Sequence, residues 1–251
     1  MTSLPAEYLA RPFAHRGLHD RAAGIVENSR AAIMAAVEAG YGVEIDIQIS
    51  ADGEAMVFHD YEMERLTGEQ GFARTRSARD LSLIKLKDSD EGIPTLSEVL
   101  SLVGGRAPLL IEIKDQHLAL GPVDGVVEKR VVQLLAGYAG QTALMSFNPH
   151  SVAHCRDMAP QVPRGRVTCD FGVEDWAQVP AARRVELAAL SDLETLGASF
   201  ISHQHDVLGD DAVTAVKATG LPVTCWTIRS PEEEAVARLV ADNITFEGFR
   251  A

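Results

Sequence analysis

The chain has few cysteines, few aromatic residues and fewer basic than acidic residues, and these shortages exclude several classes of protein. Cys155, Cys169 and Cys225 are widely spaced, and form neither a CxxC metal knuckle nor a disulfide framework. We expect them to be small, buried apolar side chains. With 23 Lys and Arg against 36 Asp and Glu, the net charge is −13. This balance argues against a nucleic-acid partner, because neutralising phosphates needs a basic face.

Long apolar runs are also missing. No stretch approaches the roughly 20 apolar residues of a membrane span. Residues 1–17 lack the basic start and apolar run of a secretory signal. We therefore expect a soluble, cytoplasmic protein. The 251 residues are 46% hydrophobic and 24% charged, which is a globular composition. A small anionic substrate remains compatible with the acidic balance, since one metal ion can reverse the field inside an acidic site.

Short β-type runs alternate with longer amphipathic runs along the chain. The predicted strands are Phe13–Arg16, Val43–Gln48, Leu109–Lys114, Ala143–Phe147, Arg166–Cys169, Phe200–Ser202, Val223–Thr227 and Ile244–Phe246. The predicted helices include Ser29–Ala39, Ser97–Val103, Val123–Tyr138, Asp211–Thr219 and Pro231–Val240. This alternation predicts a parallel (β/α)₈ TIM barrel, with a doubly wound sheet as the structural alternative.

Residues 60–95 depart from this rhythm, because they are charged and irregular. We interpret them as a short insertion after the second-strand region, following the strand-like segment 55–59 and packed across the mouth of the barrel. No internal repeat or clear linker interrupts the chain. Residues 1–251 are therefore predicted to form one domain.

Charged side chains occupy alternate positions of two predicted strands. Glu44 and Asp46 fall on one face of the second strand, and Glu112 and Lys114 fall on one face of the third. The apolar face of each strand must pack against helices, so the charged face points into the barrel. Three inward carboxylates need a cation or a shared proton, and they suit a hard divalent ion, Mg²⁺ or Ca²⁺. The alternative is carboxylates on exposed strands. We favour the inward arrangement with a cation, because buried charges are rare unless they are paired or bound to a metal.

Two histidines accompany these carboxylates. His15 and Arg16 lie at the tip of the first strand, and His59 follows an apolar run. A lone histidine in such a place is more often structural. Together with Lys114 and a metal triad, however, the set suits phosphodiester cleavage, because the cations neutralise phosphoryl oxygens while the imidazoles move protons. For Arg16 and Lys114 we favour phosphate contact or charge balance over ordinary salt bridges.

An ordered series of short motifs resembles the glycerophosphodiester phosphodiesterases. The motifs are His15-Arg16-Gly17, Glu27-Asn28-Ser29, Glu44-Ile45-Asp46, His59-Asp60, Ile93-Pro94-Thr95-Leu96, Glu112-Ile113-Lys114 and Cys225-Trp226-Thr227. The resemblance covers nearly the whole chain. It implies a barrel that binds Ca²⁺ or Mg²⁺ through Glu44, Asp46 and Glu112. It also implies that His15 and His59 act as general acid and base.

The chain departs from this family at its C-terminal end. The family's last strand ends in Thr-Asp followed by Pro, where this chain has Thr245-Phe246-Glu247-Gly248. We expect that strand to line the far side of the site, with altered substrate contacts. The family's Glu-Asn-Thr is here Glu27-Asn28-Ser29. Asn28 or Ser29 is expected to cap the next helix, and Glu27 to be a further metal ligand or a partner that orients Arg16.

Two further residues are candidates for substrate contact. Trp226 is expected at the barrel mouth, packing against the carbon skeleton of the substrate, with plain core as the alternative. His203 follows the sixth strand and is a possible substrate contact from a mouth loop.

The favoured function is metal-dependent hydrolysis of a small glycerophosphodiester to glycerol 3-phosphate and an alcohol. The first alternative is a phospholipase D-like enzyme acting on intact lipids, which should expose an apolar mouth loop; the charged residues of the insertion speak against it. The second is a binding protein that has lost turnover, which the complete set of carboxylates and imidazoles disfavours.

Overall fold

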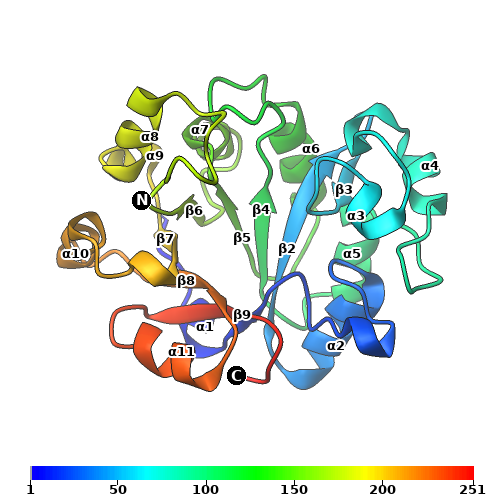
Figure 1. Ribbon diagram of the computed structural model, residues 1–251, viewed down its shortest axis with the longest axis horizontal. Helices are drawn as coiled ribbons and strands as arrows, with labels where there is room; N and C mark the ends of the chain where they lie inside the picture. The colour runs from blue at the N-terminus through cyan, green and yellow to red at the C-terminus, as the bar shows by residue number, and fades with distance from the viewer. Residues whose placement is uncertain (1) are drawn as a thin grey trace.

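Eight parallel strands close into a barrel in the computed structural model, which describes residues 2–251 (Figure 1). The eight parallel strands are β1 (Phe13–Ala14), β2 (Gly42–Ile49), β4 (Leu109–Ile113), β5 (Thr142–Ser146), β6 (Arg164–Thr168), β7 (Phe200–Gln204), β8 (Val223–Ile228) and β9 (Asn243–Phe246). A ninth strand, β3 (Ala55–Val57), is antiparallel and pairs with β2. β1 pairs in parallel with both β2 and β9, so the first and last strands join and the sheet closes. This closure confirms the TIM barrel and excludes the doubly wound sheet.

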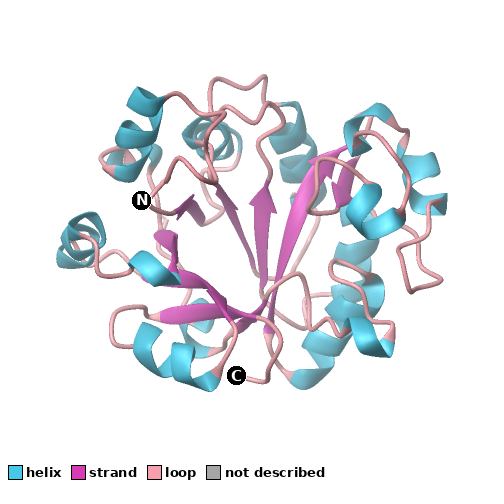
Figure 2. Ribbon diagram, in the orientation of Figure 1, coloured by secondary structure: helices cyan, strands magenta, loops and turns pink. Residues whose placement is uncertain are grey.

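Helices surround the strands on the outside of the barrel (Figure 2). They are α1 (Glu7–Ala10), α2 (Arg30–Ala39), α3 (Glu64–Thr67), α4 (Ala78–Leu83), α5 (Leu96–Val103), α6 (Val126–Leu135), α7 (Pro149–Met158), α8 (Ala181–Ala188), α9 (Leu193–Leu196), α10 (Asp211–Ala218) and α11 (Pro231–Ala237). Short 3₁₀ turns are η1 (Arg21–Ala23), η2 (Ala73–Thr75) and η3 (His205–Val207). Among the described residues, none of the helices has the length and apolarity needed to cross a bilayer.

The five helices predicted by range are confirmed to within a few residues. No range was predicted for α1, α3, α4, α7, α8 and α9. α7 carries two histidines, an arginine and an aspartate among few large apolar residues, so its helical period is weak in the sequence. α8 is mainly polar, and Leu187 is its buried residue. α2 begins where expected, because the Ser29 hydroxyl accepts a hydrogen bond from the Ala32 amide at 3.1 Å. Asn28 has a different role, described below.

Strand alternation divides the core into two parts. Val43, Ile45 and Ile47 of β2 face outward and pack with the helices in the large hydrophobic cluster. Inside the barrel, a separate apolar layer that includes Tyr8, Phe13, Leu110, Ala143 and Phe200 fills the amino-terminal half. Tyr8 of α1 closes this end, and its hydroxyl donates to the Leu109 carbonyl at 3.0 Å. The charged inward positions of β2 and β4 therefore lie in the carboxyl-terminal half of the barrel, where the cavity opens.

The insertion lies beside the mouth, whereas the sequence suggested that it crosses the mouth. β2 continues past the mouth, and β3 then returns antiparallel along its outer edge. The following α3, η2 and α4 form a small lobe with its own apolar core of Met63, Leu66, Leu81 and neighbouring residues, next to β2 and β3 (Figure 1). The turn back along β2 thus carries the chain away from the barrel axis.

Candidate active site

A cavity of about 400 Å³ opens at the carboxyl ends of the strands, where barrel enzymes carry their sites. It has two chemically different sides. The side formed by β1, β2, β4 and the β3 loop is charged and includes His15, Arg16, Glu44, Asp46, His59, Glu112 and Lys114. The side formed by β5, β6, β8 and the loops after β4 and β6 is mainly apolar and includes Leu118, Leu120, Met145, Phe147, Val167, Trp176 and Trp226.

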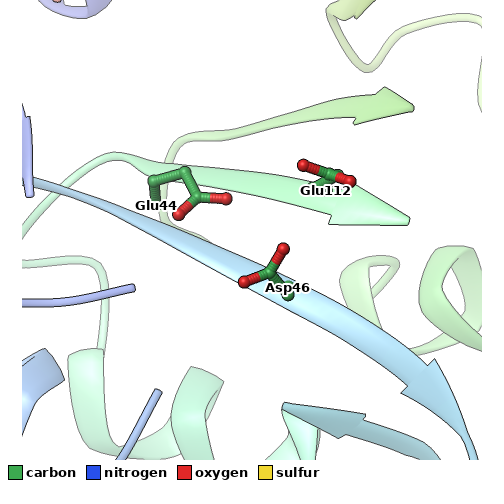
Figure 3. A group of neighbouring side chains, drawn as sticks. All are labelled: Glu44, Asp46 and Glu112. Atoms are coloured by element: carbon green, nitrogen blue, oxygen red, sulfur yellow. The ribbon is translucent and has the colours of Figure 1, made fainter. Parts of the chain in front are cut away.

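Three carboxylates form the centre of the charged side. Glu44 and Asp46 lie two residues apart on β2, and Glu112 of β4 pairs directly with Asp46 in the sheet register. One oxygen of each lies within 4.8 Å of the others, and Figure 3 shows the carboxylates gathered over the two adjacent strands. All three are buried, with exposed fractions of 2%, 1% and 7% for Glu44, Asp46 and Glu112.

The electrostatics of this cluster fit a divalent cation. Burial, followed by repulsion from Asp46 and Glu112, raises the pKa of Glu44 well above its usual value. Burial acts in the same direction on Asp46, but the charges of His59, Lys114, Arg16 and His15 hold its pKa well below its ordinary value. The donors are all carboxylate oxygens, which hard cations such as Mg²⁺ and Ca²⁺ prefer. A dication there would remove the repulsion that raises the Glu44 pKa.

Lys114 and Arg16 bring positive charge to the same cluster. The Lys114 Nζ lies 2.8 Å from Glu112 Oε1 and 3.4 Å from Asp46 Oδ1. Burial alone would lower the pKa of Lys114, but these two carboxylates raise it above its ordinary value. The Arg16 amide donates to Glu44 Oε2 at 2.9 Å, and its Nε lies 3.4 Å from Asp46 Oδ2. Both cations therefore stay charged beside the cavity.

The turn after β1 holds Arg16 in this position. Arg16 and Gly17 both have left-handed backbones, with φ of 56° and 81°. A Cβ at Gly17 would lie 2.6 Å from the backbone carbon of Ala32 in α2. Only glycine therefore fits the second position, because the turn is pressed against the helix.

Asn28 supports the cluster from the loop before α2. Its Nδ2 donates to Asp46 Oδ2 at 3.0 Å, and its Oδ1 accepts from the Asp46 amide at 3.3 Å. The prediction that Asn28 or Ser29 caps the helix is confirmed, with Ser29 as the capping residue. Asn28 fixes the rotamer of an inward carboxylate.

His15 is anchored by Glu247, a residue that we did not predict as part of the site. The His15 Nδ1 lies 2.6 Å from Glu247 Oε2, and Arg229 contacts the other oxygen at 2.9 Å. Burial lowers the pKa of His15 to about 4, although Glu247 opposes this shift. Because an ionised carboxylate only accepts hydrogen bonds, Nδ1 carries the proton and Nε2 remains for the substrate.

The position of Glu247 corrects one expectation about the C-terminal strand. β9 pairs with β1, so it lies beside His15 on the near side of the site. Glu247 follows β9. It belongs to the segment Thr245-Phe246-Glu247-Gly248, which stands in place of the family's Thr-Asp followed by Pro. The sequence did contain a signal, an acidic residue directly after the last strand. It did not show that His15 is the partner of this residue, because that contact depends on the pairing of β9 with β1.

His59 has a similar carboxylate partner in its neighbour. The His59 Nδ1 lies 2.8 Å from Asp60 Oδ1, and Arg65 of α3 binds Asp60 in turn. Burial would raise the pKa of Asp60, but His59 and Arg65 lower it to about 2. The Phe58 amide donates to the Asp46 carbonyl at 3.0 Å. The β2–β3 hairpin thus brings His59 back to the level of the carboxylates.

Glu27 is a partner of arginines, which favours the second of its two expected roles. Its Oε1 accepts from Arg16 at 2.6 Å, and both oxygens accept from Arg65 at 2.8 Å. Burial would raise the pKa of Glu27, but Arg65 and Arg16 lower it to about 2. With both oxygens held in this way, Glu27 orients Arg16 and connects it to the insertion.

Trp226 lies on the apolar side of the cavity, as expected. Its Nε1 donates to the Ser202 carbonyl at 3.0 Å. Its ring lies 5.6 Å from Phe147 and nearly perpendicular to it, and Phe147 lies 5.0 Å from Trp176. Neither Phe147 nor Trp176 was predicted. Phe147 directly follows an apolar strand and resembles a core residue, and Trp176 lies in a polar loop that carries no motif.

His203 does not line the cavity, which corrects its prediction as a substrate contact. It belongs to β7, where Ser202 and Gln204 line the cavity and His203 points the other way. It is 2% exposed, and its Nδ1 lies 2.7 Å from the Thr168 hydroxyl. β7 extends further than predicted, so a residue assigned to a mouth loop is a strand residue on the helix-facing side.

Comparisons with known proteins agree with this arrangement. Residues 15–244 match the model of the glycerophosphoryl diester phosphodiesterase family. A glycerophosphodiester phosphodiesterase of Caldanaerobacter subterraneus subsp. tengcongensis is 33% identical over 246 residues, which cover 92% of this chain and 91% of that protein.

Two solved structures share the fold. A glycerophosphodiester phosphodiesterase from Parabacteroides distasonis is 22% identical, with a TM-score of 0.73 over 94% of this chain and 92% of that one. An Oleispira antarctica phosphodiesterase in complex with the product sn-glycerol 3-phosphate is 23% identical, with a TM-score of 0.72 over 96% and 94%. From the family match and the 33% identical relative, this chain belongs to the glycerophosphoryl diester phosphodiesterase family of phosphoric diester hydrolases.

Proposed function

We propose that this protein hydrolyses small glycerophosphodiesters to glycerol 3-phosphate and an alcohol, with a bound Mg²⁺ or Ca²⁺ ion. One observation carries the proposal: a buried triad of carboxylates shares a single cavity with two imidazoles, each held by a carboxylate through its Nδ1. The product named with the Oleispira antarctica structure supports the same reaction. The substrate would be a small molecule, and neither intact lipids nor loss of turnover is favoured.

Glu44, Asp46 and Glu112 are the residues that would hold the cation. When bound, a divalent ion supplies Lewis-acid neutralisation of phosphoryl oxygens. Arg16 and Lys114 contribute further positive charge from positions next to the triad. Their ion pairs with Glu27, Asp46 and Glu112 fix both side chains before the substrate arrives.

His15 and His59 would divide the proton transfers. With Nδ1 bonded to Glu247 or Asp60, each imidazole keeps Nε2 for the substrate. Burial favours the neutral form of His15 near pH 7, so we assign His15 as the base that accepts a proton from the nucleophile. His59 would then donate a proton to the departing alkoxide. The nucleophile is water or a neighbouring glycerol hydroxyl, which would give a cyclic phosphate first.

The test compares alkyl and p-nitrophenyl esters of glycerol phosphate, because p-nitrophenolate barely needs protonation. His15→Ala and His59→Ala should each lose about 10²-fold or more in kcat on the alkyl ester. Only His59→Ala should recover much of its rate on the nitrophenyl ester. His154→Ala serves as a control, since this imidazole contacts the Val123 carbonyl and does not line the cavity. Equal losses by both variants on both esters would contradict the division of roles.

Two further expectations remain predictions. A cytoplasmic location is supported by the burial of the free thiols Cys155, Cys169 and Cys225, which need no oxidising environment. A single domain over residues 1–251, with the insertion at 60–95, can be tested by limited proteolysis.

A further inference from the structure

We infer that the apolar side of the cavity selects an alcohol that carries a quaternary ammonium group, so that the substrate class is a choline-type glycerophosphodiester. This inference rests on the proposed function. A phosphodiester has one phosphate between two alcohols. With the phosphate on the charged side of a cavity of about 400 Å³, one alcohol must meet the opposite side.

That opposite side carries an aromatic wall, formed by Phe147, Trp176 and Trp226. The Phe147 ring lies at its centre, 5.0 Å from Trp176 at an angle of 50° and 5.6 Å from Trp226 at 85°. Phe171 is buried behind the wall, 5.2 Å from Trp176. Because the rings are steeply inclined to one another, they form a concave surface. Such a surface can contact a roughly spherical group on several sides, whereas a flat group would contact one ring at a time.

The aromatic rings of the wall offer few groups for hydrogen bonding, and the polar lining residues Gln178 and Gln204 belong to neighbouring segments. The Trp226 Nε1 is already bonded to the Ser202 carbonyl, and Leu118, Leu120 and Met145 complete the apolar lining. A polyol packed against these rings would lose hydrogen bonds to water, and the rings and aliphatic side chains of the wall offer no replacements. A trimethylammonium group has an apolar surface and makes no strong hydrogen bonds, so its burial avoids this cost.

The charge around the wall also favours a cation. Asp115 and Asp175 line this part of the cavity, and no ion pair to either occurs within residues 2–251. Asp115 is buried and accepts from neutral donors, the Asn148 side chain at 2.8 Å and the Leu120 amide at 3.1 Å. Its negative charge is therefore not neutralised by a protein cation. Aromatic faces attract cations through their quadrupole, which adds to this negative potential.

The test compares kcat/KM for glycerophosphocholine with kcat/KM for the glycerophosphate ester of 3,3-dimethylbutan-1-ol. In that ester a carbon replaces the nitrogen, so the charge is removed while the shape is kept. We expect the choline ester to be favoured about 10-fold or more. A ratio near one would overturn the inference, because it would show that the wall recognises the shape and apolar area of the alcohol but not its charge.

The tryptophans make the test more specific. The chain has two, Trp176 and Trp226, and both lie on the wall. Both can be replaced biosynthetically with increasingly fluorinated tryptophans. Fluorine lowers the negative electrostatic potential of the ring faces and keeps the shape of the ring nearly constant. The ratio should then fall step by step toward one, whereas an unchanged ratio would contradict a cation–π contribution. Phe72→Leu is the matched control, since Phe72 is an aromatic residue on the insertion and does not line this cavity.

Two further substrates distinguish failure of this inference from failure of the proposed function. If glycerophosphoethanolamine and glycerophosphoglycerol are cleaved without a preference for choline, the inference alone is wrong. If no glycerophosphodiester is cleaved, the proposed function is wrong. In that case, titration with choline chloride followed by tryptophan fluorescence still decides the role of the wall. Quenching by choline, but not by 3,3-dimethylbutan-1-ol, supports the role, and equal responses refute it.

Discussion

Replacing Glu247 with glutamine tests whether this carboxylate sustains the function of His15. The Glu247→Gln side chain keeps its size but loses the charge that lies 2.6 Å from the imidazole Nδ1. In the reaction, His15 becomes an imidazolium when it accepts a proton. With charge centres about 4 Å apart and an effective dielectric constant of about 20, the carboxylate stabilises that cation by about 4 kcal/mol.

Arg229 reduces this figure, because it lies 2.9 Å from the other oxygen of Glu247 and shares its charge. Allowing for about half of the attraction leaves roughly 2–3 kcal/mol, which corresponds to a loss of about 10²-fold in kcat. KM should change little, since the carboxylate contacts the imidazole and not the substrate. Glu247→Asp keeps the charge one methylene further away, so we expect it to recover part of the loss.

The assay combines steady-state kinetics with an NMR titration of the His15 ring nitrogens. Glu247 raises the pKa of His15 against the larger effect of burial, so Glu247→Gln should shift the titration below about pH 4. Glu194→Gln on the exposed face of α9 is the control for a simple loss of charge. If Glu247→Gln is folded and keeps its kcat within twofold, or if the His15 pKa rises, the reasoning is refuted.

Three further predictions concern the surroundings of the site. Glu44→Gln should lower affinity for Mg²⁺ or Ca²⁺ in calorimetric titrations and lower activity, with partial rescue at high metal concentration; full activity after EDTA treatment would contradict a metal site. His203→Leu should leave kcat and KM within twofold while lowering the free energy of unfolding by about 1–3 kcal/mol, because the Thr168 hydroxyl loses its buried partner; a large change in KM would show that the cavity assignment is wrong. Arg65→Met should destabilise the protein by about 1–2 kcal/mol at pH 7 in urea denaturation, since Glu27 and Asp60 lose a shared partner. Because their lowered pKa values stabilise the folded state above about pH 4.5 and this effect is lost as the pH falls toward about 2, the difference should shrink over that range, and a constant difference would contradict an ionic origin.

The sequence by itself determined the strands and the central carboxylates. In β2 and β4, residues alternate between faces with a period of two, and the apolar set must pack against helices. This left Glu44, Asp46 and Glu112 inside the barrel, as the structure has them. His203 shows the limit of the same reasoning. Its strand was predicted two residues too short, ending at Ser202 where β7 ends at Gln204, and the alternation was therefore not applied to it.

Only the tertiary structure decided which distant residues meet. Glu247 and His15 are 232 positions apart and come together because the last strand pairs with the first. No local period encodes that contact, since it depends on where the barrel closes. The same holds for the aromatic wall, whose rings come from the residue after β5, from β8 and from the loop after β6. Short-range patterns fix which face a side chain occupies, while the closure of the sheet fixes its neighbours.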